Sequence, residues 1–101
     1  MPTNENQSPQ AETPKFFYVY ILNCKDGGIY TGCTGNLRER ITRHQKGWVP
    51  ITKERLPVRL AWCCAFPERT RAFEFEQYLK SGSGRAFLKR HLLAKGDVNL
   101  K

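Results

Sequence analysis

The chain alternates short apolar runs with polar, glycine-rich connections, and this pattern predicts a small mixed domain. Residues 16–22, FFYVYIL, are aromatic or aliphatic and carry no charge, which predicts a strand buried on both faces. The turn-forming residues 23–28 follow, and residues 29–33 predict a second, antiparallel strand. Residues 58–66, VRLAWCCAF, predict a third strand.

Apolar positions at helical spacing predict three helices. In the first of them, Leu37, Ile41 and His44 recur at a spacing that places all three on one face. The element order is therefore ββαβαα. This order predicts an α/β domain of the α+β type, with a three-stranded, mostly antiparallel sheet flanked by helices. The predicted helices cover residues 36–46, 68–80 and 84–93.

The two ends of the chain differ in composition from the middle. Residues 1–14 contain three prolines and no aromatic residue, so we expect a disordered tail there, a folded domain over 15–95 and a second tail over 96–101. The chain shows neither a secretory signal nor an apolar run long enough to span a bilayer, which favours a cytoplasmic protein. The four cysteines form no Cys-x-x-Cys motif, which predicts reduced, mostly buried thiols.

The folded part of the chain is strongly basic. The whole chain has a formal net charge of +8, and the only charged residues of 1–14 are Glu5 and Glu12. The remainder therefore has 17 positive against 7 negative charges, a net +10. A small domain with this charge favours an anionic partner, of which nucleic acid is the first candidate and an anionic membrane surface the second. The sequence predicts no long amphipathic basic helix, so the membrane surface is the weaker candidate.

Glu76 is a carboxylate beside an apolar stripe. On the predicted helix 68–80 it borders the face formed by Ala72, Phe75 and Leu79. Burial of a carboxylate is costly unless the group is paired or binds a cation. The pattern leaves three alternatives open: a functional carboxylate, a salt bridge to a neighbouring arginine, and a rotated helix that exposes Glu76 to water.

Two further groups combine side chains that can bind phosphate or move protons. Arg40 and His44 lie four residues apart on the first predicted helix, and they are either site residues or a surface cation and a half-buried, hydrogen-bonded histidine. Tyr18, Tyr20 and Tyr30 lie on the first two predicted strands. Such tyrosines either pack against one another or supply hydroxyl groups to a site.

These pieces occur in an order that resembles the GIY-YIG nuclease superfamily, and in particular its small stand-alone bacterial-type members. The family's first motif corresponds to Tyr18-Val19-Tyr20 and its second to Tyr30-Thr31-Gly32, so the literal Gly-Ile-Tyr at 28–30 is a coincidence of the turn. We expect Gly32 to leave room for a phosphate at the sheet surface. The other matching motifs are Asn36-Leu37-x-x-Arg40-x-x-x-His44, Ala72-x-x-x-Glu76-x-x-x-Lys80 and Ser-Gly-Ser-Gly-Arg at 81–85.

The resemblance implies a metal-dependent endonuclease that hydrolyses phosphodiester bonds of DNA. It implies that Glu76 holds a single Mg²⁺ or Mn²⁺ ion and that Arg40 neutralises charge on the phosphate. It also implies that Tyr20, Tyr30 and His44 orient or deprotonate the attacking water. Where the repair-nuclease branch of the superfamily has a lysine after the second motif, this chain has Cys33.

The basic residues around these motifs are candidates for binding the nucleic-acid backbone. We expect a monomer, with a weak dimer as the alternative. A second possible function on the same fold is a nucleic-acid-binding module that does not cleave. The candidate nucleic-acid-binding residues are Arg40, Arg43, Lys80, Arg85, Lys89 and Arg90.

Overall fold

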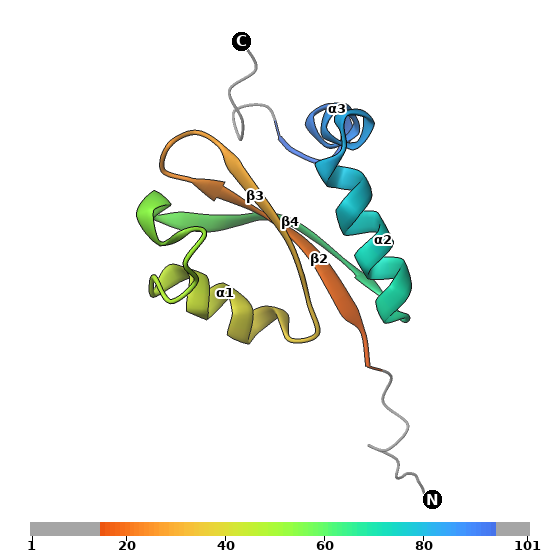
Figure 1. The fold of residues 1–101 in the computed structure, drawn as a ribbon, viewed down its shortest axis with the longest axis horizontal. Helices are drawn as coiled ribbons and strands as arrows, with labels where there is room; N and C mark the ends of the chain where they lie inside the picture. Colours follow the sequence, from red (N-terminus) through yellow and green to blue (C-terminus); the bar gives the residue numbers. More distant parts are fainter. Residues whose placement is uncertain (1–14, 95–101) are drawn as a thin grey trace, which may run out of the picture.

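A three-stranded antiparallel sheet in the order β3-β2-β4 forms the centre of the computed structural model, which describes residues 15–94 (Figure 1). The strands are β2 (Phe17–Cys24), β3 (Ile29–Thr34) and β4 (Val58–Phe66). Each predicted strand is confirmed, and both pairings are antiparallel. The predicted tails over 1–14 and 96–101 lie outside the described residues.

Helices cover both faces of this sheet. Figure 1 shows α1 (Leu37–Gln45) on one face and α2 (Arg69–Lys80) with α3 (Gly82–His91) on the other. The predicted order ββαβαα is confirmed. The connection between α1 and β4 contains a short 3₁₀ helix, η2 (Lys53–Arg55). Within the described part of the chain, none of the helices combines the length and apolar character needed to cross a membrane.

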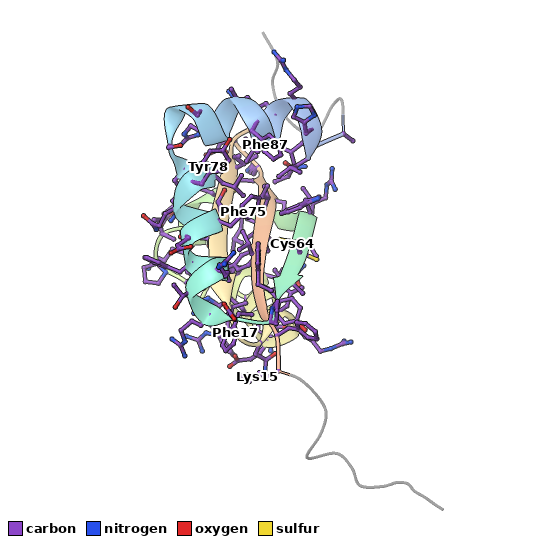
Figure 2. All side chains as sticks on the ribbon, turned by 90° about the vertical axis from the view of Figure 1, so that its right-hand side faces the viewer. Lys15, Phe17, Cys64, Phe75, Tyr78 and Phe87 are labelled. Carbon is purple, nitrogen blue, oxygen red and sulfur yellow. The ribbon has the colours of Figure 1, made fainter. Side chains whose placement is uncertain are left out.

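The central strand β2 supplies both halves of the core because successive side chains of a strand point to opposite faces. Val19, Tyr20, Ile21 and Leu22 are all 0% exposed, which confirms that this strand is buried on both faces. Val19 and Ile21 pack with the buried side chains of α2 and α3, whereas Tyr20 and Leu22 pack with those of the α1 face. The α2 face also carries a row of aromatic contacts through Phe75, Tyr78 and Phe87 (Figure 2).

Side-chain hydrogen bonds set where α1 and α3 begin. The side chain of Asn36 accepts a hydrogen bond from the Glu39 amide and so caps α1. Ser81 caps α3 in the same way, since its hydroxyl oxygen accepts from the Gly84 amide at 3.1 Å. This cap starts α3 at Gly82, two residues before the predicted start. At Gly84 a side chain would overlap the backbone of the preceding helix, so the sharp α2–α3 corner requires a glycine there.

Gly32 makes room for a side chain of the protein itself. It pairs with Tyr20 across the β2–β3 ladder, and a Cβ atom at position 32 would overlap the Tyr20 phenol, coming within 2.9 Å of Cε1. The expectation that this glycine leaves the sheet surface open to a phosphate is therefore wrong. The space belongs to the Tyr20 ring, which is fully buried.

We predict that Gly32→Ala lowers the free energy of unfolding by about 1–3 kcal/mol, the usual cost of overpacking a buried position. Chemical denaturation followed by circular dichroism measures this change. Gly82→Ala is the matched control, because a Cβ atom there meets nothing within 4 Å and the residue opens a helix. The control should be neutral or slightly stabilising. Equal effects of the two substitutions would contradict the assigned role of Gly32.

Candidate active site

Three aromatic rings form a cluster on the α1 face of the sheet. Tyr20 on β2 and Tyr30 on β3 have ring centroids 6.3 Å apart. The His44 ring on α1 lies 5.7 Å from the Tyr20 ring and 5.2 Å from the Tyr30 ring. The structure therefore brings together the two tyrosines matched to the paired motifs and the predicted histidine.

Both ring nitrogens of His44 have hydrogen-bond partners. Nδ1 lies 2.8 Å from the Thr52 hydroxyl and Nε2 lies 2.9 Å from the Tyr20 hydroxyl. The Thr52 hydroxyl also lies 3.5 Å from the Val49 carbonyl, an arrangement that favours the histidine tautomer with its proton on Nδ1. Nε2 is then the acceptor, and the Tyr20 hydroxyl donates to it. The histidine is 0% exposed, more deeply buried than the half-buried alternative expected from the pattern.

This environment keeps both groups neutral near pH 7. Burial lowers the pKa of His44, and the positive charge of Arg40 lowers it further. Burial raises the pKa of Tyr20 to about 12, an effect that a hydrogen bond from Arg40 only partly offsets. Because Tyr20 and His44 are both 0% exposed, neither reaches solvent directly.

Arg40 lies beside this pair on α1 with an unused donor. The guanidinium is close enough to the Tyr20 hydroxyl to act on its pKa. Its Nε–H is buried and has no hydrogen-bond partner among the residues that the structure describes. An unsatisfied buried donor is costly, and an oxyanion would satisfy it.

Glu76 approaches from the opposite face of the sheet. It lies on α2 and is 5% exposed, so the alternative in which it faces water is wrong. Its Oε2 atom pairs with Lys80 Nζ at 2.6 Å and its Oε1 atom accepts from Gln77 Nε2 at 2.7 Å. Glu76 therefore forms a salt bridge, but the arginine partner expected from the pattern is wrong, because the partner is a lysine one turn along the helix. The pKa of Cys33 on β3 is raised mainly by burial of the thiol, and the negative charge of Glu76 is the second cause.

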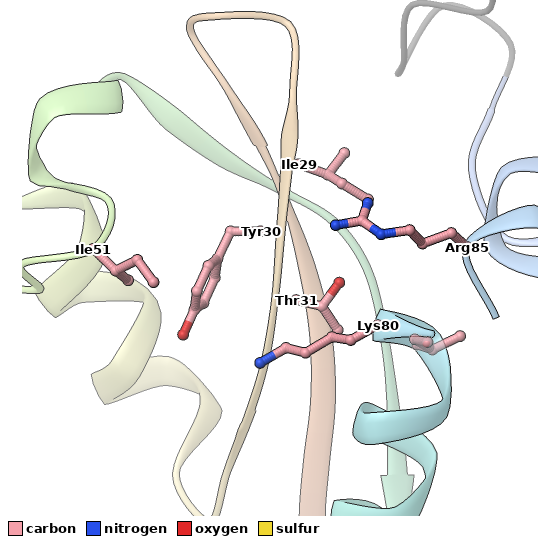
Figure 3. A pocket seen from close by; sticks show the side chains of 7 residues that line it. Ile29, Tyr30, Thr31, Ile51, Lys80 and Arg85 are labelled. Atoms are coloured by element: carbon pink, nitrogen blue, oxygen red, sulfur yellow. The ribbon is translucent and has the colours of Figure 1, made fainter. Parts of the chain in front are cut away.

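The two faces meet at the edge strand β3. A hollow of about 200 Å³ opens there between β3, the α2–α3 corner and the connection that follows α1. Figure 3 shows the Tyr30 ring reaching into it from one side and the Lys80 ammonium from the other. Lys80 Nζ lies 6.0 Å from the centroid of the Tyr30 ring. The residues lining the hollow are Ile29, Tyr30, Thr31, Ile51, Leu79, Lys80 and Arg85.

The remaining predicted cations lie outside this hollow. Arg43 is half-buried on α1, and its carbonyl accepts from the Trp48 amide. Lys89 and Arg90 are exposed on α3, where Arg90 lines a separate hollow of about 230 Å³. Of the six candidates for nucleic-acid binding, Lys80 and Arg85 are therefore the two that line the hollow beside Tyr30.

Two residues of this region were missed by sequence reasoning. Thr52, which is 0% exposed and fixes the His44 tautomer, lies in a connection with no helical or alternating pattern. Gln77 holds one oxygen of Glu76, but its position beside that residue in sequence gave no signal, because adjacent helix residues do not normally face one another.

A single carboxylate, that of Glu76, is the candidate ligand for a divalent cation. The Glu76 carboxylate offers the hard oxygen ligand that Mg²⁺ and Mn²⁺ accept, and Mg²⁺ commonly keeps several waters beside one or two protein carboxylates. Across residues 15–94 there is no group of three His, Cys, Asp or Glu side chains that could enclose a metal ion. The site therefore suits a cation that water and substrate oxygens help to hold, rather than a closed structural site.

The fold and the order of the motifs define a small α+β domain with paired tyrosine motifs on its first two strands. Residues 16–90 match the GIY-YIG family, described as the GIY-YIG catalytic domain. Because the match covers most of the chain, the protein belongs to the GIY-YIG family.

The relatives are small bacterial proteins whose names state no activity. The UPF0213 protein BH0048 of Halalkalibacterium halodurans is 44% identical over 69 residues, 67% of this chain and 73% of that protein. A UPF0213 protein of Bacillus licheniformis is 38% identical over 64 residues, 62% of this chain and 66% of its own length. The solution NMR structure of BH0048 superposes with a TM-score of 0.52 at 35% identity, covering 81% of this chain and 90% of that one.

We predict that the free energy of unfolding falls as pH drops below about 6.5, because of His44. The pKa of His44 is lower in the folded protein than in the unfolded chain. As the pH falls, the unfolded chain therefore binds a proton at this histidine first and is stabilised relative to the native state. Urea denaturation between about pH 8 and pH 5 measures the slope. His44→Asn should flatten this part of the profile, whereas His91→Asn on the exposed end of α3 should retain it. Parallel profiles for the wild type and His44→Asn would contradict the lowered pKa.

Proposed function

We propose that this protein is a divalent-metal-dependent endonuclease that hydrolyses phosphodiester bonds of DNA. The observation that supports this function is a hollow at β3 lined by a tyrosine and two cations, one of which is paired with the buried carboxylate of Glu76. Glu76, Lys80 and Arg85 come from one face of the sheet and Tyr30 from the other. A phosphodiester needs this combination, because its cleavage requires a polarising group, a water-directing group and positive charge.

Positive charge around the hollow would hold the phosphate. Lys80 and Arg85 line it, and Arg40, which lies outside its lining, has a buried Nε–H with no partner among residues 15–94. In this role the arginine neutralises charge that grows on the phosphate oxygens as water adds. Arg43, Lys89 and Arg90 would contact more distant phosphates, which gives affinity without sequence choice.

Tyr30 is the group best placed to receive the proton of the attacking water. It is half-buried and lines the hollow, whereas Tyr20 and His44 have no exposed surface. We assign those two a positioning role: their hydrogen bond fixes two rings that pack against Tyr30. In this scheme Tyr30 directs the water and takes its proton while passing its own hydroxyl proton to solvent in the hollow. The rigid rings behind it keep the hydroxyl aimed at the hollow.

Glu76 would hold the cation. When bound, Mg²⁺ or Mn²⁺ supplies Lewis-acid polarisation of the phosphate and stabilises charge on the leaving oxygen. A single protein carboxylate implies that the ion binds weakly until the substrate arrives.

The alternative function is a nucleic-acid-binding module that does not cleave. The net charge of +8 supports both functions equally well. Glu76 favours the nuclease, because a module that only binds phosphate gains nothing from a carboxylate at the phosphate site.

We predict that Glu76→Gln abolishes cleavage and leaves DNA binding largely intact, since the amide keeps the volume but cannot hold the cation. Labelled single-stranded, duplex and branched DNA should be incubated with each protein, with and without Mg²⁺ or Mn²⁺. Binding is measured by fluorescence anisotropy in EDTA. Cleavage by the variant at the parental rate would exclude Glu76 as the metal ligand. Binding without cleavage by the wild type on every substrate would favour the alternative function.

Tyr30→Phe should reduce the cleavage rate by about 10²-fold or more, the range expected for loss of a group that transfers a proton. The substitution keeps the ring that packs against Tyr20 and His44, so circular dichroism should be unchanged. Tyr78→Phe on α2 is the matched control, because this tyrosine is 41% exposed and belongs to the aromatic row of the α2 face. A loss no larger than that of the control would remove Tyr30 from the reaction.

A further inference from the structure

Lys80 lies between the Glu76 carboxylate and the hollow beside Tyr30. Its ammonium pairs with Glu76 Oε2 at 2.6 Å, and its side chain also lines the hollow proposed to receive the phosphate. The lysine is 45% exposed at its side chain, whereas the Glu76 side chain is 7% exposed. The carboxylate is therefore fixed and buried, and the lysine is the partner that has room to move.

The ion pair with Lys80 compensates the buried charge of Glu76. Gln77 Nε2 donates to the other carboxylate oxygen, so both oxygens have a partner in the protein. A buried carboxylate without its partner is strongly destabilised, which makes the lysine a substitute for a cation at this position. A divalent ion that binds Glu76 has to displace the ammonium from Oε2.

A phosphate in the hollow would offer Lys80 a second partner. The ammonium already lies 6.0 Å from the centroid of the Tyr30 ring, at the side of β3 where the hollow opens (Figure 3). A lysine side chain has a flexible stem with four carbons, so its ammonium can turn from the carboxylate to a phosphate oxygen without any backbone movement.

We propose that Lys80 is an internal counter-ion that occupies Glu76 in the free protein and is transferred to the substrate phosphate, so that metal binding depends on substrate binding. This inference rests on the proposed function of the site. The exchange makes the two binding events mutually favourable, since phosphate removes the competitor of the metal and the metal releases the lysine for phosphate. It also keeps the buried carboxylate compensated at every stage.

The test measures metal and nucleic-acid binding separately, with no cleavage involved. Lys80→Met removes the charge and keeps most of the stem volume. Isothermal titration calorimetry with Mn²⁺ and no nucleic acid should give an affinity for the variant about fivefold to tenfold tighter than for the wild type, because a buried carboxylate without a counter-ion favours a cation. Anisotropy with a labelled oligonucleotide in EDTA should show weaker binding. A gain for one ligand and a loss for the other is the signature of the exchange.

Three controls separate this role from a general charge effect. Lys89→Met loses the same charge from α3 without touching Glu76, and should weaken oligonucleotide binding with no change in Mn²⁺ affinity. Lys80→Arg keeps the positive charge and should retain the weak Mn²⁺ binding of the wild type. Glu76→Gln combined with Lys80→Met should abolish the gain. Added Mn²⁺ should raise the Tm of Lys80→Met more than that of the wild type, which reports the same linkage if calorimetric heats are small.

Equal Mn²⁺ affinity and equal Mn²⁺-induced Tm shifts for Lys80→Met and the wild type would overturn the exchange. If the wild type nevertheless cleaves DNA and Glu76→Gln does not, the proposed nuclease function would stand and the lysine exchange would be excluded. Absence of both cleavage and Mn²⁺ binding in every protein would overturn the function and the exchange together.

Discussion

A sheet separates the helices on its two faces everywhere except at an edge strand, and the site of this protein depends on that exception. Tyr20 and His44 belong to the α1 face and Glu76 to the α2 face. At β3, one of the two edge strands in the sheet order β3-β2-β4, side chains from both faces reach the same hollow. Lys80 spans this boundary, pairing with Glu76 on one side and approaching the Tyr30 ring on the other.

The α1 half of the site is built as a rigid support. Gly32 admits the Tyr20 ring, and the Tyr20 hydroxyl donates to His44, which Thr52 holds in one tautomer. Each contact is buried, so a change at any member leaves a cavity, an overlap or an unsatisfied polar atom. The histidine therefore contributes to this support through its ring and hydrogen bonds, and its lowered pKa keeps it neutral near pH 7.

Most of the fold follows from the sequence, because its strands and helices have strong periodic patterns. The uncharged run that became β2 and the apolar spacing of Leu37 and Ile41 needed no tertiary information. Glu76 and Lys80 are four apart on one helix, so their ion pair was also open to prediction. The face of the sheet on which α2 packs could not be predicted, since no local sequence pattern determines how the chain crosses over after β4. Thr52 was equally hidden, because its partner His44 lies eight residues away across an irregular connection.

The cost of the buried charges supports the proposal that Glu76 has a functional role. A buried ion pair contributes little net stability, and apolar residues of similar volume often stabilise a fold as well or better. Position 76 borders a core of Ala72, Leu79 and Leu88 that an apolar side chain would extend. A basic module that only binds nucleic acid would lose nothing by such a change. A carboxylate and a lysine kept at the edge of this core are useful where a cation and a phosphate must be bound side by side, which is the requirement of phosphodiester hydrolysis.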